Sequence, residues 1–314
     1  MVFTVDEIQM TEGGPYGYPF LMNMSERLLR SAQRWAISSL DFYIDTPSDH
    51  MFSIHHMGVS VEHASKAYLA SVSTVLLAPD RPSVDDLLVL SGNEDKTQKG
   101  VEGIRTAAGE TVISRTTNLL RKSRGNSDSV RMLREARNGI THLGVWDQGS
   151  GTKELLASGI TYIDEILAAL SRTEGWFWRN HEGLSRRILE DTESEVNLRY
   201  KEKIQRAKGT FQMKVGHLPA DQKKQVIVSL EAIPVSSRWH MSIPTYCPAC
   251  GSLGVASGRD HLEDYGAWFS PRHFGCRVCD LVLDGLELRL AGITGHAIDE
   301  IDEDPDWEPD NESM

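Results

Sequence analysis

The four cysteines of this 314-residue chain form its most specific chemical pattern. They occur as two Cys-x2-Cys pairs separated by 25 residues, Cys247 with Cys250 and Cys276 with Cys279. Each pair places two thiolates on a tight turn, and two such turns complete a tetrahedron around Zn²⁺. Because four thiolates leave no position for water, the predicted zinc is structural. The competing interpretations are two disulfides and a redox Cys-x-x-Cys pair. A cytoplasmic chain without a βαβ pattern disfavours both.

Two histidines and a group of basic and aromatic residues lie near the cysteines in sequence. His261 and His273 fall between the pairs, but with four thiols available we expect neither to bind the metal. Interleaved arginines and aromatic rings can bind single-stranded nucleic acid, and the same rings can instead form the core of a small zinc module. The residues concerned are Arg259, Tyr265, Trp268, Phe269, Arg272, Phe274, Arg277 and Arg289.

A second pattern, Arg137-Asn138-x3-His142, combines residue types suited to cleaving RNA. Histidine has an unperturbed pKa of about 6.5, so its side chain can give or take a proton near neutral pH. Arginine stays charged and presents a planar fork to two phosphate oxygens. Positions five apart do not share a face of an ideal helix. We therefore expect a break or bend at Gly139 to bring Arg137 and His142 into one cleft. The alternative for His142 is a structural role as a cap or core residue.

The elements around this motif are predicted to be helices. Asn23 and Glu26 have the spacing of a capping box, and apolar residues then recur at steps of three and four. Helices of this length joined by short loops are typical of an antiparallel bundle. The predicted helices cover about 23–43, 50–77, 110–122, 128–138 and 153–170, and 91–109 is predicted to be a loop.

The second half of the chain has a different pattern. Residues 186–208 hold twelve charged residues in twenty-three, which predicts a partly exposed helix joining two modules. Apolar runs at 226–228 and 281–283, and alternating leucines over 286–290, predict strands. The expected fold class is α+β, with an all-α antiparallel bundle followed by a β-rich, zinc-ribbon-like module. The expected division is an N-terminal segment 1–22, the helical domain 23–180, a charged linker helix 181–210, the β-rich zinc-ribbon module 211–297 and an acidic tail 298–314.

The motif at a helix end inside an antiparallel bundle resembles the HEPN superfamily, whose motif is Arg, a polar residue, a short spacer and His. Arg137, Asn138 and His142 match these positions, and 61–69 is similar to the second helix of such domains. The resemblance covers about 23–175. It implies a homodimer whose two motifs face each other and form a metal-independent endoribonuclease site. Other members are inactive and serve as binding or toxin-neutralising modules.

The resemblance also implies roles for the three motif residues. His142 would remove the ribose 2′-OH proton, Arg137 would stabilise charge on the pentacoordinate phosphorus, and Asn138 would orient the His or the phosphate. An RNA substrate such as tRNA or mRNA would be left with 2′,3′-cyclic phosphate and 5′-OH ends. The implied role is that of a toxin or an anti-phage defence protein, with a regulatory protein or phage trigger as a further partner. The alternative is a non-catalytic adaptor that binds RNA or a partner protein. In either case the zinc module would serve in recognition or regulation.

Histidines also cluster on the predicted second helix. His50, His55, His56 and His63 occur there together with Glu62. They could supply a polar group to the cleft of the motif, or a metal site. The alternative is a hydrated structural role.

The net charge of −12 arises mostly in the acidic tail. Residues 298–314 hold nine acids and no Lys or Arg, which leaves 36 acids against 33 bases elsewhere, a net charge of −3. The acidity therefore does not exclude a nucleic-acid partner. No apolar run reaches the roughly 18–20 residues of a membrane span, and the N-terminus lacks the basic region of a signal peptide. We expect a cytoplasmic protein without a membrane partner.

Overall fold

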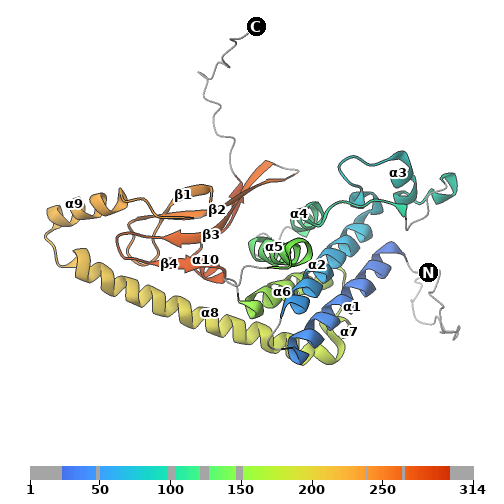
Figure 1. Cartoon of the computed structure of the whole chain (residues 1–314), viewed down its shortest axis with the longest axis horizontal. Helices are drawn as coiled ribbons and strands as arrows, with labels where there is room; N and C mark the ends of the chain where they lie inside the picture. Colours follow the sequence, from blue (N-terminus) through green and yellow to red (C-terminus); the bar gives the residue numbers. More distant parts are fainter. Residues whose placement is uncertain are drawn as a thin grey trace, which may run out of the picture.

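The computed structural model describes residues 23–46, 50–97, 103–120, 127–145, 151–237, 239–263 and 266–297. The predicted segments 1–22 and 298–314 and the residue Tyr265 lie outside the described residues, as does the side chain of His261. The described fold combines a helical bundle with an antiparallel sheet, and the long helix α8 (Glu182–Phe211) runs beneath both (Figure 1). The α+β class predicted from the sequence is therefore confirmed.

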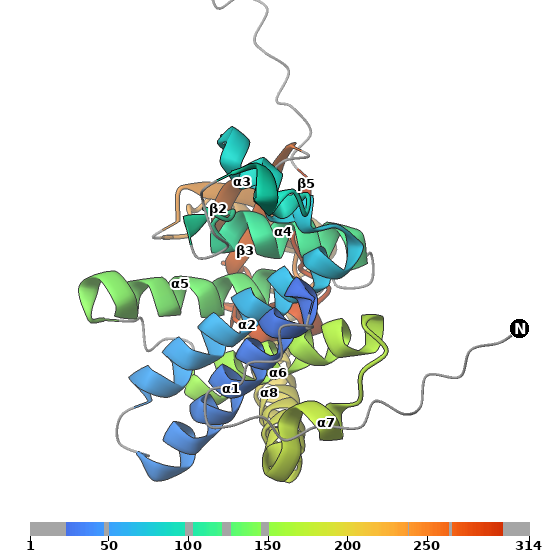
Figure 2. The same ribbon diagram turned by 90° about the vertical axis from the view of Figure 1, so that its right-hand side faces the viewer.

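The bundle is organised around α2, which contacts α1, α4, α5 and α6. Figure 2 shows α5 lying across α2 on the side opposite α1. The short 3₁₀ segments η1 (Thr74–Leu77), η2 (Glu94–Lys96) and η5 (Arg179–His181) join neighbouring helices. The helices are α1 (Met24–Asp45), α2 (Met51–Val72), α3 (Val84–Leu90), α4 (Gly109–Leu120), α5 (Ser127–Leu143), α6 (Thr152–Ala169) and α7 (Glu174–Trp178).

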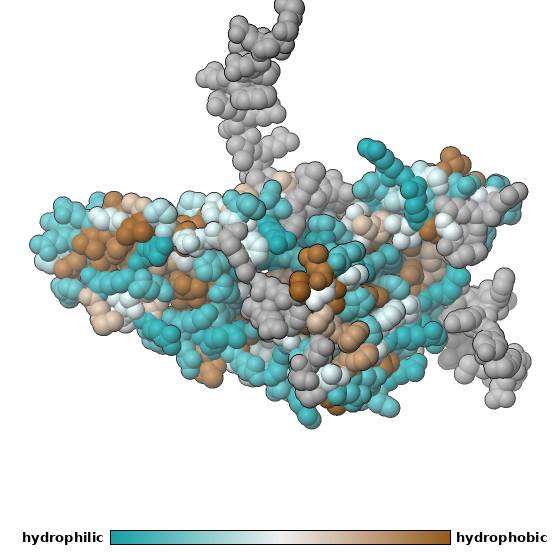
Figure 3. All heavy atoms as spheres, in the orientation of Figure 1, coloured by the Kyte–Doolittle hydropathy of each residue, from teal (hydrophilic) through white to brown (hydrophobic). Residues whose placement is uncertain are grey.

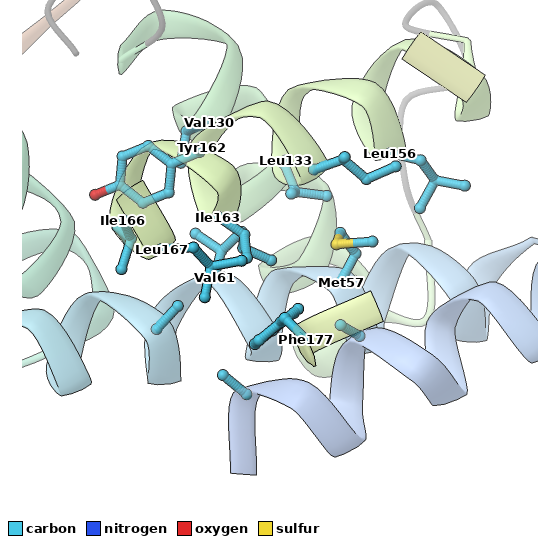
Figure 4. Close-up of a cluster of buried hydrophobic side chains, with 14 of the residues drawn as sticks. Met57, Val61, Val130, Leu133, Leu156, Tyr162, Ile163, Ile166, Leu167 and Phe177 are labelled. Carbon is cyan, nitrogen blue, oxygen red and sulfur yellow. The ribbon is translucent and has the colours of Figure 1, made fainter. Parts of the chain in front are cut away.

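Helical periodicity explains how these helices pack. Asn23 caps α1 by accepting a hydrogen bond from the backbone N–H of Glu26. From α2, Met57 and Val61 point into a core where α5 and α6 also contribute side chains (Figure 4). Each large apolar side chain buried in this way contributes about 1.5–3 kcal/mol to folding. The fully buried residues of this core include Leu40, Ile54, Met57, Val61, Leu133, Leu156, Ile160, Tyr162, Ile163, Ile166, Leu167 and Phe177.

The second part of the fold is a sheet with the order β1-β2-β3-β4, in which neighbouring strands run antiparallel and β5 also pairs with β3. A π-helical turn (Gln212–Gly216) and α9 follow α8 and precede the sheet (Figure 1). The elements are α9 (Ala220–Glu231), β1 (Met241–Tyr246), β2 (Leu253–Glu263), β3 (Gly266–Gly275), β4 (Val282–Asp284), α10 (Leu286–Leu290) and β5 (His296–Ala297).

Two strand predictions are wrong, because both segments are helical. Residues 226–228 lie in α9, where Pro219 precedes a run of strong helix formers and the apolar side chains pack on the sheet module. The leucines of 286–290 lie in α10, which begins after Gly285 in the left-handed region at φ 56°. In a strand, Glu287 would lie on the face opposite the three leucines. In the helix it is buried and faces α8 instead.

Ion pairs around Glu287 connect the two parts of the fold. Its carboxylate, 1% exposed, accepts from Arg199 at 2.7 Å and from Lys203 at 2.6 Å, and both donors belong to α8. Arg199 also donates to Glu154 of α6 at 2.6 Å. One arginine therefore bridges the bundle and the sheet module, which fixes how α10 sits against α8.

Candidate functional site

The motif residues lie on α5, which runs as an unbroken helix past Gly139. Residues Ser127–Leu143 form one continuous helix, so the predicted break at Gly139 is wrong. At about 100° per residue, Arg137 and His142 point about 140° apart. The side chain of Arg137 is half-buried against α2, whereas that of His142 is exposed. The helix therefore presents the two side chains on different faces.

Arg137 is held in place by two acceptors. Its Nη1 donates to Oδ1 of the adjacent Asn138 at 2.9 Å, and its Nη2 donates to Oε2 of Glu62 on α2 at 3.3 Å. Lys66 donates to the other carboxylate oxygen of Glu62 at 2.8 Å. The Arg137 side chain is 26% exposed, so it is partly accessible to solvent.

Gly58 allows Arg137 to lie this close to α2. A Cβ added at Gly58 would fall 2.7 Å from Cβ and 2.9 Å from Cγ of Arg137. Ordinary carbon contacts are about 3.5–4.0 Å, so any side chain at this position would push the two helices apart. Nothing in the local sequence shows that this glycine faces α5, so its role is visible only in the fold.

The charges around Arg137 keep Glu62 ionised and the neighbouring histidines neutral. Burial opposes the ionisation of Glu62, but the hydrogen bond and charge of Lys66 and the charge of Arg137 outweigh it and lower its pKa. Burial lowers the pKa of His55, and the charge of Arg137 lowers it further. Burial also lowers the pKa of His63, and Lys66 adds to that effect. The site thus offers one fixed carboxylate, two cations and uncharged imidazoles near neutral pH.

The histidines of α2 pack mainly against α1. Nδ1 of His56 lies 3.0 Å from the hydroxyl of Ser38, and Nδ1 of His63 lies 2.9 Å from that of Ser31. Among the described residues, the cysteines are the one group of metal-ligating side chains that clusters closely enough to hold an ion. These contacts support the structural role for the histidines, while Glu62 supplies the polar group at the motif.

The four cysteines converge as their spacing predicts. Their sulfur atoms all lie within 4.8 Å of one another, with Cys247 to Cys279 at 3.5 Å and Cys250 to Cys276 at 3.7 Å. A Zn–S bond of about 2.3 Å requires sulfurs about 3.8 Å apart in a tetrahedron, so the spacing suits a metal ion such as zinc. Hydrogen bonding with Cys247 lowers the pKa of Cys250 and raises the pKa of Cys276 and Cys279. A cation is needed to hold all four as thiolates.

The turns that carry the cysteines have matching geometry. In the first, Cys247 N–H donates to the carbonyl of Ser252, and Gly251 adopts a left-handed φ of 75°. In the second, Cys276 N–H donates to the carbonyl of Leu281, and the left-handed residue is Asp280, at φ 56°. His273 lies outside the group of four sulfur atoms, and its Nδ1 pairs with Asp284 at 2.8 Å.

The basic and aromatic residues around the cysteines have structural partners. Phe269 and Phe274 are fully buried in the core of the sheet module, so they offer no surface for stacking. Arg277 donates to the carbonyl of Pro234 at 2.7 Å. These two phenylalanine rings therefore favour the core interpretation over nucleic-acid binding, whereas Trp268 is only half-buried.

Two arginines of the sheet hairpin reach α5. Arg272 donates to Oε1 of Glu135 at 2.9 Å, and Arg259 lies 3.3 Å from the same oxygen. The Arg272 side chain is 3% exposed, so this contact is buried on the arginine side. Glu135 stands two positions before Arg137, and the sequence analysis did not identify it. The sheet module that carries the four cysteines is thus tied directly to the helix that carries the motif.

A cavity of about 470 Å³ lies elsewhere, between α6, α8 and α10. Its lining includes Thr161, Thr192, Asn197 and Arg289, and none of the three motif residues. This cavity is therefore separate from the three motif residues.

The chain matches no family model, and comparison with the curated proteins and with the solved structures found no match. None of the described helices combines the length and apolar composition needed to cross a membrane.

Proposed function

We propose that this protein is a metal-independent endoribonuclease of the HEPN type that leaves 2′,3′-cyclic phosphate and 5′-OH ends. The observation that carries the proposal is the state of Arg137, a half-buried guanidinium oriented by Asn138 and Glu62 on the same helix as the exposed His142. A fixed, partly desolvated arginine is what a phosphate clamp requires. The substrate is RNA, such as tRNA or mRNA, because the nucleophile is the ribose 2′-OH.

The proposed chemistry assigns one role to each motif residue. The imidazole of His142 in one copy takes the proton from the ribose 2′-OH. The 2′-oxygen then attacks the adjacent phosphorus to form the cyclic phosphate. The bond from phosphorus to the 5′-oxygen breaks, and that oxygen receives a proton from water or from the second His142. Arg137 neutralises the charge that builds on the non-bridging oxygens. Asn138 holds Arg137 in this orientation.

The proposal includes a homodimer. Because Arg137 and His142 of one chain leave different faces of α5, the proposal assigns to each site the arginine of one copy and the exposed histidine of the other. Leu143 and Val145 at the C-terminal end of α5 are 75% and 59% exposed, and Figure 3 shows hydrophobic residues over this part of the surface. A second copy would bury them.

We also propose that the cysteine cluster holds a structural Zn²⁺ and that the zinc module regulates the nuclease. Four sulfur ligands leave the ion no open position for substrate or water. The contacts of Arg272 and Arg259 with Glu135 give the module a direct connection to α5. Such control suits a toxin or an anti-phage defence protein that stays silent until a regulatory protein or phage trigger binds.

A second candidate function is a non-catalytic adaptor that binds RNA or a partner protein. It is favoured by the ion pair of Arg137 with Glu62, which occupies part of the guanidinium in the unbound chain. It is also favoured by the separation of Arg137 from His142 around an unbroken helix.

The experiment that separates the two functions compares purified wild type with His142→Ala on total tRNA and mRNA in EDTA. The incubation is brief, circular dichroism checks that both proteins stay folded, and the ends of the products are identified. Cyclic-phosphate ends from the wild type alone support the nuclease. RNA binding by both proteins, without cleavage by either, supports the adaptor.

A further inference from the structure

Arg259 on β2 is an exposed arginine whose guanidinium the fold holds in place. Its Cζ lies 5.1 Å from the centroid of the Trp239 ring, which is the distance of a cation–π contact. Its Nη1 lies 3.3 Å from Oε1 of Glu135 on α5, the one carboxylate of the described residues that pairs with it. The Arg259 side chain is nevertheless 48% exposed. The ring and the carboxylate thus orient a guanidinium that solvent, and hence a ligand, can reach.

The charges around Glu135 leave Arg259 with a surplus positive charge. Arg272 donates to the same carboxylate oxygen at 2.9 Å, and its side chain is only 3% exposed. One buried arginine therefore neutralises the one carboxylate, and the exposed arginine adds a second positive charge. Asp260 follows Arg259 on β2, but the alternation of a strand directs its side chain to the opposite face of the sheet. Two arginines against one glutamate give this corner a net charge of +1, which favours an anion.

This corner lies on the face of α5 that carries His142. Glu135 and His142 are seven residues apart, so their side chains leave the helix within about 20° of each other and about 10.5 Å apart along its axis. Arg137 leaves a different face and packs against α2. Within one chain, the exposed arginine on the side of His142 is therefore Arg259, which the sheet module contributes.

From this arrangement we propose that Arg259, held against Trp239, binds a backbone phosphate of the RNA whose cleavage is assigned to His142. The inference rests on the proposed function and adds a binding residue that lies outside the three-residue motif. A planar guanidinium can present two parallel N–H groups to two oxygens of one phosphate. Successive phosphates of one strand lie about 3.4 Å apart along the axis of a duplex, so about 10.5 Å corresponds to roughly three nucleotides. Arg259 thus holds the strand a few nucleotides away from the scissile bond.

Binding to a fluorescein-labelled oligouridylate tests the proposal by fluorescence anisotropy over a series of salt concentrations. All proteins are full-length and carry His142→Ala, so that cleavage does not interfere. Arg259→Gln removes the charge, and Arg259→Lys keeps it. Arg187→Gln is the matched control, because Arg187 is exposed on α8 and forms no ion pair with a described residue. Circular dichroism and thermal unfolding check that each variant is folded.

The salt dependence of binding counts the phosphate contacts. Each contact contributes about 0.7–0.9 to the slope of log K against the logarithm of the salt concentration. We therefore expect Arg259→Gln to reduce this slope by about one contact and to weaken binding by about 5- to 8-fold at about 0.1 M salt. Arg259→Lys should keep the slope, and Arg187→Gln should bind like the parent.

An unchanged slope in Arg259→Gln overturns the phosphate site and leaves this arginine with a structural contact to α5. An equal loss of slope in Arg187→Gln also overturns it, because the effect would then be one of overall charge. Cleavage assays on proteins that retain His142 separate the two proposals. If Arg259 contributes to the slope but the wild type does not cleave RNA, the phosphate site stands and the nuclease fails. If the wild type cleaves RNA and the slope does not depend on Arg259, the nuclease stands and the phosphate site fails.

Discussion

Replacing Gly58 by alanine should impair the Arg137 site while leaving most of the fold intact. The new Cβ would lie 2.7 Å from Cβ of Arg137, and ordinary contacts are about 3.5–4.0 Å, so α5 must move away by about 1 Å. Because Cβ is fixed to the backbone, rotation of the arginine side chain cannot relieve this clash. A shift of about 1 Å in a catalytic group costs on the order of 10²-fold in rate.

The effect of Gly58→Ala on stability should be much smaller. Alanine gains roughly 1 kcal/mol over glycine inside a helix, and overpacking a buried contact costs about 1–3 kcal/mol. The variant should therefore be at most about 2 kcal/mol less stable than the wild type. Gly209→Ala in α8 is the matched control, since nothing lies within 4 Å of its new Cβ. It should be as stable as the wild type or slightly more stable, with an unchanged rate.

Urea denaturation measures the stability of each variant, and the rate of cyclic-phosphate formation measures its activity. Glu62→Gln provides a second perturbation that keeps the packing, because it removes the charged partner of Arg137 without adding volume. We expect it to lower the rate by about 10-fold. If Gly58→Ala is folded and cleaves RNA at the wild-type rate, the position of Arg137 against α2 has no part in the reaction.

Three further predictions concern stability and metal content. Burial raises the pKa of Asp164 from 3.8 to about 7, so its contribution to stability is present at low pH and is lost as the pH rises from about 4 to 7. Asp164→Asn should thus be more stable than the wild type at pH 8, by up to about 4 kcal/mol. At pH 4 it should show no such gain. Equal gains in stability at both pH values would contradict the raised pKa of Asp164. Glu135→Gln removes the charge that faces the buried Arg272, so it should destabilise the protein by more than the roughly 1 kcal/mol limit expected for Glu110→Gln, whose carboxylate is half-exposed. Denaturant midpoints measure the difference. Mercurial titration should release about one zinc per chain from the wild type and none from Cys279→Ser, whereas a wild type free of metal would refute the zinc site.

Local signals predicted much of the bundle. Apolar residues that recur at steps of three and four predicted the helix at 153–170, which the structure shows as Thr152–Ala169. The prediction succeeded because the apolar stripe of this helix faces the core. Asn23 as a cap is confirmed in the same way. The helix α3 was not predicted, although Ser83 and Asp86 form a capping box there. Its seven residues are too few for a clear period.

The errors in the second half arose where tertiary packing decided the structure. Residues 226–228 are β-branched, which favours strands, but in α9 Val226 and Ile227 are partly buried against the sheet module while Val228 is exposed. The leucines of α10 alternate over too few positions to separate a strand from a short helix. Glu287 decides between them, since only the helix places it against Arg199 and Lys203.

The two candidate sites also differ in how far local sequence spacing predicts them. The cysteine cluster was predictable, because Cys-x2-Cys pairs carry their geometry in the spacing and the four sulfurs converge as expected. The contact of Arg137 with Glu62 joins residues 75 positions apart, and that of Arg272 with Glu135 spans 137. No periodicity encodes such pairs, so they could be found only from the fold.

The measurement that tests the central claim most directly is the rate of cyclic-phosphate formation by Arg137→Lys beside the wild type, on the same RNA in EDTA. Lysine keeps the charge but loses the planar fork, so the account predicts a fall on the order of 10²-fold or more in a folded protein that still binds RNA. A rate near that of the wild type would contradict the account, because Arg137 would then not be the phosphate clamp.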